Sequence, residues 1–238
     1  DFICKNSQLQ DGGFSFNWTP RVSVGCRSGD LTRAMIKTGI NDERTARGLS
    51  WIIKNQRHDG GWLHCPFKGS SDVMKLILVK KSGKGHLDDP DTGIPSCPVA
   101  TCSCLGALLE SGENEFNESI ARAALFLLSK ELSGKGQKYR TRCGLYIDPV
   151  KPGFPVMSQF DPITLSILLT RAGFLKTPRG GELFNLVMKL QGSEGRWQSL
   201  NIKQGMITEK KGDSRWVTLN ALRMIKAVTD EENQLEKA

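Results

Sequence analysis

The sequence predicts an all-α protein assembled from repeated helical hairpins. A glycine-rich segment that leads to an aromatic residue occurs three times. Amphipathic runs with helical spacing precede such segments, and runs richer in apolar and small residues follow them. Because self-similarity at intervals of tens of residues is the signature of a repeat architecture, these observations together decide the fold class.

The repeated segment is expected to join two helices. Glycine can end a helix in the left-handed conformation without a side-chain clash, and the acidic residue before it favours a turn. Gln10 and Gln56 are 46 residues apart. That spacing leaves room for two helices of roughly 12–15 residues with their connections. The copies are Gln10–Phe14, Gln56–Trp62 and Gln191–Trp197, with a weaker fourth candidate at Gly134–Tyr139.

Two sets of helices follow from the apolar spacing. The runs before the glycines are Glu43–Gln56, Glu118–Leu132 and Gly181–Gln191. The runs after them are Leu31–Gly39, Pro98–Gly112, Pro162–Gly173 and Trp216–Val228. Helix-start residues precede the second set, at Asp30, Ser96, Asp161 and Asp213 with Ser214. We expect the second set to form inner helices around an axis and the first set to lie outside them.

The composition suits one globular domain over residues 1–238 with a charged tail at 229–238. The chain has 238 residues, 38% of them hydrophobic, and a net charge of +8. Its longest apolar stretch, Ala121–Leu128, is far shorter than the ~20 residues of a membrane-spanning helix, so we expect a soluble or peripheral protein. The basic residues are dispersed among loops. Solvated loop charge and recruitment of an anionic ligand both remain open, and nucleic-acid binding is not expected.

The cysteines indicate a reducing compartment. There are seven, an odd number without regular pairing, and no signal-like segment begins the chain. A disulfide framework is therefore not expected, and we predict a cytoplasmic protein.

The glycine-rich segments resemble the QW-type repeats of squalene and hopene cyclases and the related repeats of protein prenyltransferase beta subunits. Cys97–Thr101, Gly153–Pro155 and Ser214–Arg223 also resemble stretches of uncharacterised prokaryotic proteins that carry prenyltransferase and squalene-oxidase repeats. The resemblance covers most of the chain and implies an α/α toroid, here of about three and a half to four hairpins. Because the first motif follows Asp1–Gln10 directly, we expect an incomplete N-terminal helix and a smaller or open ring, or a homo-oligomer.

Carboxylates are the first candidates for chemistry. Asp88, Asp89 and Asp91 occupy three of four positions in the longest loop, and Asp161 precedes an expected inner helix. Such acids could hold a metal with a diphosphate, or protonate an alkene if one were desolvated. The cyclases to which the chain is similar use Asp-x-Asp-Asp and ionising synthases use Asp-Asp-x-x-Asp, and Asp-Asp-Pro-Asp matches neither. A solvated acidic turn is the alternative.

Starts of inner helices would converge near the mouth of a central cavity. Asp30, Cys97, Thr101, Asp213 and Trp216 are therefore candidate ligand-binding residues. For the aspartates the alternative role is a helix cap, and for Trp216 it is packing within the repeat.

A zinc site is a further possibility, with His64, Cys65 and Cys97 as ligands. The spacing matches no zinc finger or ribbon, the prenyltransferase Asp-x-Cys pair is missing, and buried structural cysteines are the alternative. No cofactor is predicted, although zinc or magnesium could serve the acids or thiols.

Three functions remain open at this point. The first is a terpenoid-cyclase or prenyltransferase-like protein that binds an isoprenoid or other apolar ligand in a central cavity. The second is a non-catalytic scaffold for a ligand or protein, and the third is zinc-dependent thiol or prenyl transfer. Aromatic residues make up only 7% of the chain, which limits carbocation stabilisation, and no serine-nucleophile elbow, P-loop or dinucleotide fingerprint is present.

Overall fold

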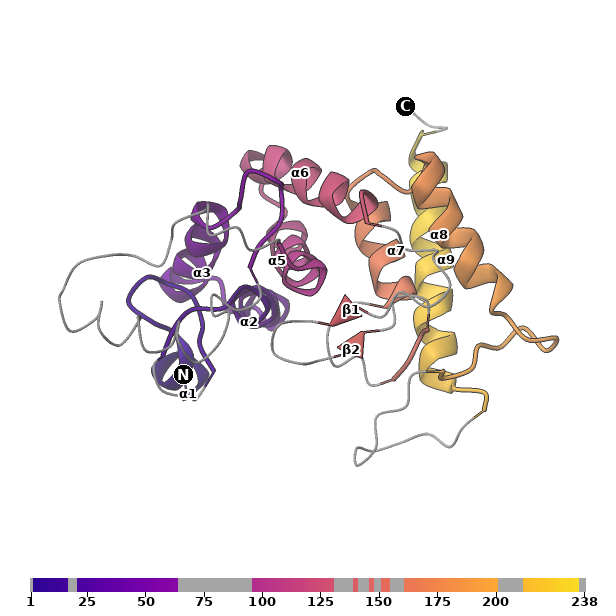
Figure 1. The fold of residues 1–238 in the computed structure, drawn as a ribbon, viewed down its shortest axis with the longest axis horizontal. Helices are drawn as coiled ribbons and strands as arrows, with labels where there is room; N and C mark the ends of the chain where they lie inside the picture. Colours follow the sequence, from indigo (N-terminus) through magenta and orange to yellow (C-terminus); the bar gives the residue numbers. More distant parts are fainter. Residues whose placement is uncertain are drawn as a thin grey trace. The chain divides into compact units, whose positions relative to one another are not determined.

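The computed structural model describes residues 2–16, 21–63, 96–130, 139–140, 146–147, 151–154, 161–200 and 212–235. Over these ranges the chain is mostly helical, which confirms the all-α class (Figure 1). Two short antiparallel strands, β1 (Tyr139–Arg140) and β2 (Tyr146–Ile147), pair with Tyr139 opposite Ile147. No helix in the described part is both long and apolar enough to cross a membrane.

Backbone contacts divide the chain into two compact units. The N-terminal unit comprises Asp1–Leu127 and Thr141–Leu145, and the C-terminal unit comprises Leu128–Arg140 and Tyr146–Ala238. Each unit has its own buried core. The single domain expected over residues 1–238 stays a prediction, as does the ring of hairpins.

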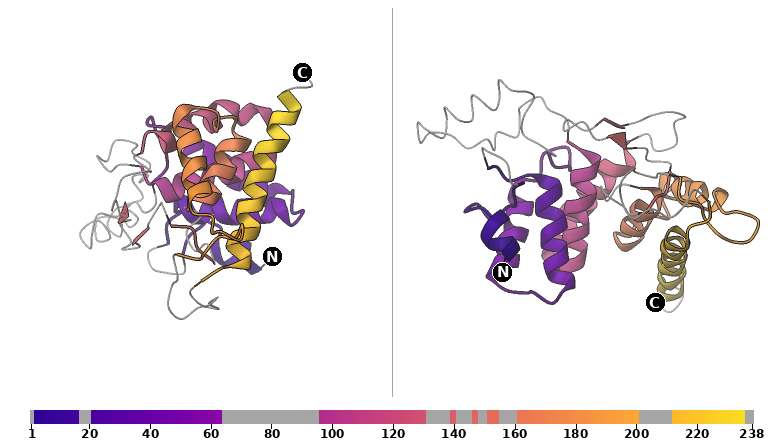
Figure 2. Two further views of the ribbon diagram at one scale, coloured as in Figure 1. Left: turned by 90° about the vertical axis from the view of Figure 1, so that its right-hand side faces the viewer. Right: turned by 90° about the horizontal axis from the view of Figure 1, so that it is seen from below.

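The N-terminal unit is built around two helices that run side by side, α2 (Gly25–Lys37) and α5 (Pro98–Ser111) (Figures 1 and 2). Helix α3 (Glu43–Lys54) packs against α2. The remaining helices are α1 (Phe2–Ser7) and α6 (Asn117–Leu128), and the 3-10 turn η1 (Asn114–Phe116) leads into α6. Side chains that are completely buried in this unit include Phe14, Ile52, Trp62, Leu105, Leu108 and Leu127.

Helix α2 begins six residues before the position expected from the sequence. We expected Asp30 to cap a helix from Leu31, but α2 starts at Gly25 and Asp30 lies inside it. The start is fixed by the backbone of Phe14: its carbonyl accepts from the Val24 amide at 3.0 Å, and its amide donates to the Ser28 hydroxyl at 2.9 Å. A tertiary contact therefore outweighs the capping propensity of Asp30, which a local reading of the sequence cannot reveal.

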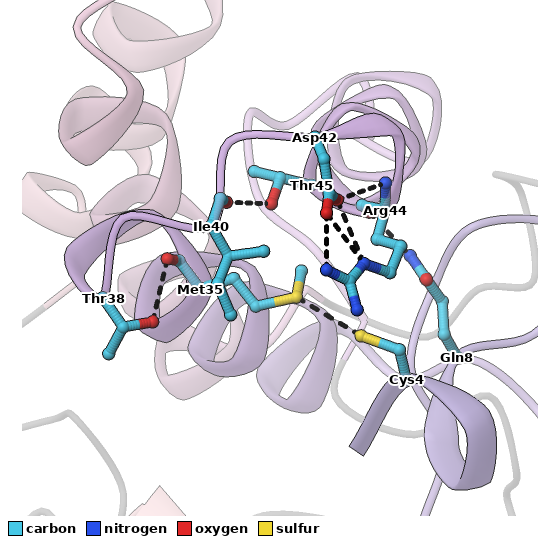
Figure 3. Close-up of polar contacts among 8 residues, drawn as sticks. All are labelled: Cys4, Gln8, Met35, Thr38, Ile40, Asp42, Arg44 and Thr45. Atoms are coloured by element: carbon cyan, nitrogen blue, oxygen red, sulfur yellow. Dashed lines mark hydrogen bonds and ion pairs between the residues drawn. The ribbon is translucent and has the colours of Figure 1, made fainter. Parts of the chain in front are cut away.

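Helix α3 begins at the predicted residue because Asp42 caps it. The Asp42 carboxylate accepts from the Arg44 amide at 3.0 Å and also pairs with the Arg44 guanidinium (Figure 3). The hydroxyl of Thr45 donates to the carbonyl of Ile40, which closes the preceding turn. Asp42 thereby satisfies one orphan amide at the start of the helix, and Thr45 satisfies a carbonyl of the turn before it.

The C-terminal unit contains three helices, α7 (Pro162–Arg171), α8 (Pro178–Lys189) and α9 (Arg215–Leu235). Helix α7 packs against both of the others. Their shared core consists of Ile163, Val187, Trp197, Val217, Ala221 and Met224. Helix α9 continues past Val228, where the sequence predicted its end, so much of the expected tail 229–238 is helical.

The glycine-rich turn recurs with the same hydrogen bonds, which bear out the predicted start of the second and third copies and correct that of the first. The side-chain amides of Gln8, Gln56 and Gln191 donate to the carbonyls of Gly12, Gly60 and Gly195 at 3.0, 3.0 and 3.1 Å. The first copy therefore begins at Gln8, two residues before Gln10. Each of the three glycines has a positive φ, between 74° and 92°, a conformation that glycine adopts at little cost.

The aromatic residue of each turn is tied to the helix that follows. The backbone amides of Phe14, Trp62 and Trp197 donate to the hydroxyls of Ser28, Thr101 and Thr218 at 2.9, 3.2 and 3.0 Å. Each hydroxyl belongs to the fourth residue of its helix. The aromatic rings are completely buried. One short motif thus ends one helix, buries a large ring and positions the next helix.

Candidate functional site

Polar and sulfur-containing side chains gather where α2 meets α5. We call this region the α2–α5 seam, formed by Cys26, Asp30 and Arg33 of α2 with Ser103, Cys104 and Glu110 of α5. The two backbones touch at Gly29, where a Cβ atom would lie only 2.3 Å from the Ser103 carbonyl carbon. Glycine at this position therefore brings the polar side chains of both helices into one region.

Asp30 is the most perturbed acid of the seam. Burial raises the pKa of its carboxyl to about 6, against the smaller opposing influences of Ser103, Arg33 and Arg27. Its Oδ1 atom is buried and has no hydrogen-bond partner, and the same holds for the Ser103 hydroxyl. Ser103 thus lies near enough to favour the charged carboxylate without reaching hydrogen-bonding geometry. A ligand that donates a hydrogen bond would satisfy Asp30.

The Cys104 thiol of the seam is held in the protonated state. Burial raises the pKa of Cys104 well above its usual value, and nearby Cys26 and Asp30 act in the same direction. The Cys104 thiol donates to the Gly25 carbonyl at 3.3 Å. Because the thiolate is the nucleophile and metal ligand, this environment favours a structural role for Cys104. Buried structural cysteines were the alternative to a zinc site in the sequence analysis.

An ion pair closes one end of the seam. The guanidinium Nε of Arg33 lies 3.4 Å from Oε2 of Glu110, and the Lys37 ammonium lies 3.7 Å from the same oxygen. Gly106 leaves room for this arrangement, since a Cβ there would approach Nη1 of Arg33 to 3.0 Å. Glu110 therefore offsets part of the charge of Arg33, which favours the charged form of Asp30.

Asp161 belongs to the C-terminal unit and acts as a helix cap. Its Oδ1 accepts from the Thr164 amide at 2.8 Å, and its Oδ2 accepts from the Thr164 hydroxyl at 3.2 Å. Burial raises the pKa of this carboxyl to about 6 despite those bonds. The cap predicted from the sequence is confirmed. Both oxygens are engaged at the helix start, and the expected catalytic role of Asp161 stays a prediction.

Two candidate ligand-binding residues stand at the start of α5. The Thr101 hydroxyl accepts from the Trp62 amide at 3.2 Å and donates to the Cys97 carbonyl at 2.9 Å. Cys97 is the half-buried N-cap residue, and its side chain makes no capping bond. Thr101 is therefore occupied by the turn, which is a structural role.

The remaining two candidates lie around the start of α9. The backbone of Asp213 pairs with that of Gln198, and the capping bond comes from Ser214, whose hydroxyl accepts from the Val217 amide at 3.1 Å. The ring of Trp216 is 43% exposed and stacks on Phe154 with 5.2 Å between centroids. Trp216 therefore lies outside the buried core of the C-terminal unit, which contains Trp197.

Several predicted site residues fall outside the described residues, namely Asp88, Asp89, Asp91, His64 and Cys65. Within the ranges that the structure describes, no group of three or more histidine, cysteine, aspartate or glutamate side chains is arranged to hold a metal ion. The acid triplet and the zinc ligands stay predictions.

Sequence reasoning missed Ser103, Arg33 and Glu110 as parts of one arrangement. Cys26, Asp30, Arg33 and Lys37 recur at helical spacing along α2, so they form one stripe on that helix. This stripe was a usable signal, but it was hidden because the helix was expected to begin at Leu31. The pairing with Glu110 on α5 has no local signature.

Comparisons of the chain with protein-family models, with curated proteins and with solved structures find no significant match.

Proposed function

We propose that this protein is an α/α-toroid repeat protein of the terpenoid-cyclase and prenyltransferase type that binds an isoprenoid or other apolar small molecule in a central cavity. Asp30 would be the polar contact for that ligand. The observation that carries the proposal is the buried Oδ1 of Asp30, which lacks a hydrogen-bond partner on the α2–α5 seam. A desolvated acid with an unsatisfied oxygen costs stability, and such a group is typical of a functional site.

The recurring turn supports the architecture in this proposal. Three copies share one set of hydrogen bonds, and the Gln56 copy also contacts α6, because Gln56 donates to the Ser119 carbonyl at 2.9 Å. In the proposed ring, α2, α5 and α7 are inner helices. Asp30 would then lie on the inner layer, where a bound molecule could reach it.

Native mass spectrometry of the protein purified from its host tests the proposal. The wild type should carry a lipid-like mass, and D30N should lose it while D42N keeps it. Asp42 is a suitable control because its carboxylate is exposed and caps α3 in the same unit. Equal ligand content in wild type and D30N would remove Asp30 from the site, and a bare chain in every sample would contradict ligand binding.

A non-catalytic scaffold is the second candidate, and the packing of the seam favours it. Gly29 places the two backbones in contact, and the Cys104 thiol is kept protonated, so the seam uses a close helix contact and a buried thiol for packing. Metal analysis of the same samples distinguishes this scaffold from the third candidate, zinc-dependent thiol or prenyl transfer. Stoichiometric zinc that is lost in C97A would support zinc-dependent chemistry and argue against the scaffold.

A further inference from the structure

The C-terminal unit exposes an apolar surface that its own core does not use. Of the large hydrophobic side chains exposed in the described chain, four belong to this unit, and three of these share one face of α9: Trp216 at 43%, Leu219 at 37% and Leu222 at 52%. The opposite face of α9 is formed by Val217, Ala221 and Met224, which are at most 1% exposed. Helix α9 is therefore apolar on two sides, and only one side is covered.

The exposed surface extends beyond α9 to a neighbouring segment. Trp216 stacks on the half-buried ring of Phe154, with an angle of 14° between the planes. Leu200, which is 42% exposed, is joined to this segment by a 2.9 Å hydrogen bond from its amide to the Pro152 carbonyl. Trp216 thus packs against Phe154 on one side and is still partly exposed.

Positive charge is interleaved with the apolar side chains. Arg215, Arg223 and Lys226 are exposed and fall on the same side of α9 as Trp216, Leu219 and Leu222 at helical spacing. No acidic residue occurs between Arg215 and Lys226. Asp213 precedes the helix, and Asp230 lies one turn beyond Lys226. The occupant of this surface must therefore offer both apolar contact and negative charge.

We propose that this surface of α9 docks on an anionic phospholipid membrane, with Trp216, Leu219 and Leu222 in the headgroup region and Arg215, Arg223 and Lys226 on lipid phosphates. A helix face that combines tryptophan and leucine with arginine and lysine is suited to lie in the plane of a membrane interface. Tryptophan favours that interface because its ring is apolar and its N–H is polar. The inference concerns a surface separate from Asp30 and does not depend on the proposed ligand.

Co-sedimentation of the full chain with vesicles tests this docking surface. The probes are vesicles of phosphatidylcholine alone and of phosphatidylcholine with an equimolar amount of phosphatidylglycerol. We expect the wild type to sediment with the second kind and to be released by added salt. Failure to bind the anionic vesicles would overturn the proposal.

Two double variants separate the contributions, each with a matched control. L219Q/L222Q removes apolar contact, and L125Q alters a comparably exposed leucine on α6. R223E/K226E reverses two charges, and K54E/K189E makes the same charge change at exposed lysines of α3 and α8. We expect R223E/K226E to lower partitioning at least about 20-fold, since each basic residue near an anionic surface contributes about fivefold. L219Q/L222Q should also lose binding, while both controls bind as the wild type does.

The competing occupant is a second copy of this chain. Sedimentation equilibrium without lipid would then show a dimer that L219Q/L222Q dissociates, and this result would overturn membrane docking. Partitioning of R223E/K226E no weaker than that of K54E/K189E would overturn it as well. Circular dichroism melting confirms that each variant is folded before its partitioning is compared.

Discussion

The indole nitrogen of Trp62 donates a 2.7 Å hydrogen bond to the carbonyl oxygen of Ile52, ten residues earlier in the chain. Ile52 lies in the last turn of α3, where carbonyl groups lack amide partners within the helix. Trp197 makes the same bond to Val187 in the last turn of α8, at 2.8 Å. The aromatic residue of the turn therefore caps the helix that precedes it, in addition to holding the helix that follows.

W62F should destabilise the N-terminal unit by about 1–3 kcal/mol, because it removes this bond and leaves a buried carbonyl without a partner. Phenylalanine already occupies the equivalent position at Phe14, so the variant is expected to fold. Urea denaturation followed by far-UV circular dichroism measures the change. W216F is the control, since Trp216 is partly exposed and donates no such bond to a helix end. Equal effects of the two variants would show that the bond to Ile52 contributes nothing specific.

G60A should cost about 2–4 kcal/mol, for two separate reasons. The φ of Gly60 is +85°, and a Cβ atom would lie 2.4 Å from the Arg122 carbonyl oxygen of α6. G39A shares the first reason only, because Gly39 has a φ of +79° with open space around it, and its cost should be about 1 kcal/mol. Chemical denaturation of the two variants isolates the contact with α6. The contact is refuted if G39A proves as costly as G60A.

G29A should separate α2 from α5 and destabilise the protein by about 2–3 kcal/mol, because overpacking at a backbone contact cannot be relieved by a side-chain rotation. G181A is the matched helical substitution. Gly181 lies in α8, where an added Cβ atom would meet nothing within 4 Å, so alanine should stabilise that helix by about 0.5–1 kcal/mol. Thermal melting should therefore move in opposite directions for the two variants, and a stabilised G29A would contradict the close approach.

The stability difference between D30N and wild type should depend on pH. The folded pKa of Asp30, about 6, is above its ordinary value of 3.8, so the folded protein binds a proton that the unfolded chain has released between these values. The contribution of Asp30 to stability is therefore full below pH 3.8 and is lost as the pH rises towards 6. D30N should gain about 1–3 kcal/mol relative to wild type across this window and no more above it.

Denaturation at closely spaced pH values from 3.5 to 8 measures this difference. Subtracting the unfolding free energy of the wild type from that of D30N at each pH removes the similar contribution of Asp161, which is present in both proteins. A difference that stays constant with pH would show that Asp30 is not desolvated.

The sequence allowed the helices to be placed because their causes are local. Asp42, Asp161 and the glycines of the turns act within a few residues, and α3, α5, α7 and α8 accordingly begin or end close to their predicted positions. The register of the first turn was predicted wrongly because Gln8 and Gln10 both precede Asp11 and the glycines. Only the bonds from the Gln8 amide to Gly12 and to Arg44 distinguish them, and Figure 3 shows Gln8 beside Arg44.

The candidate site was harder to predict because its causes are not local. The pKa of Asp30 depends on its burial and on the opposing influence of Ser103, 73 positions away in the chain, and no pattern around Asp30 reports either. Asp161 shows the converse case, since Thr164 lies three residues from it and the cap was predicted correctly. Residues whose partners lie on the same helix are predictable, and residues that meet across the seam are not.

The turn amides also link neighbouring parts of the chain. Gln8 donates to the Arg44 carbonyl of α3 at 2.8 Å, and Gln56 donates to the Ser119 carbonyl of α6 at 2.9 Å. In the opposite direction, the Arg47 guanidinium donates to the Leu9 carbonyl at 2.7 Å, and the Arg122 guanidinium donates to the Arg57 carbonyl at 2.6 Å. The turns at Gln8 and Gln56 are thus fastened to helices that come later in the chain. In the language of one-dimensional cooperative systems, these bonds are nearest-neighbour coupling terms, so opening α6 releases the turn at Gln56 and propagates unfolding towards α3.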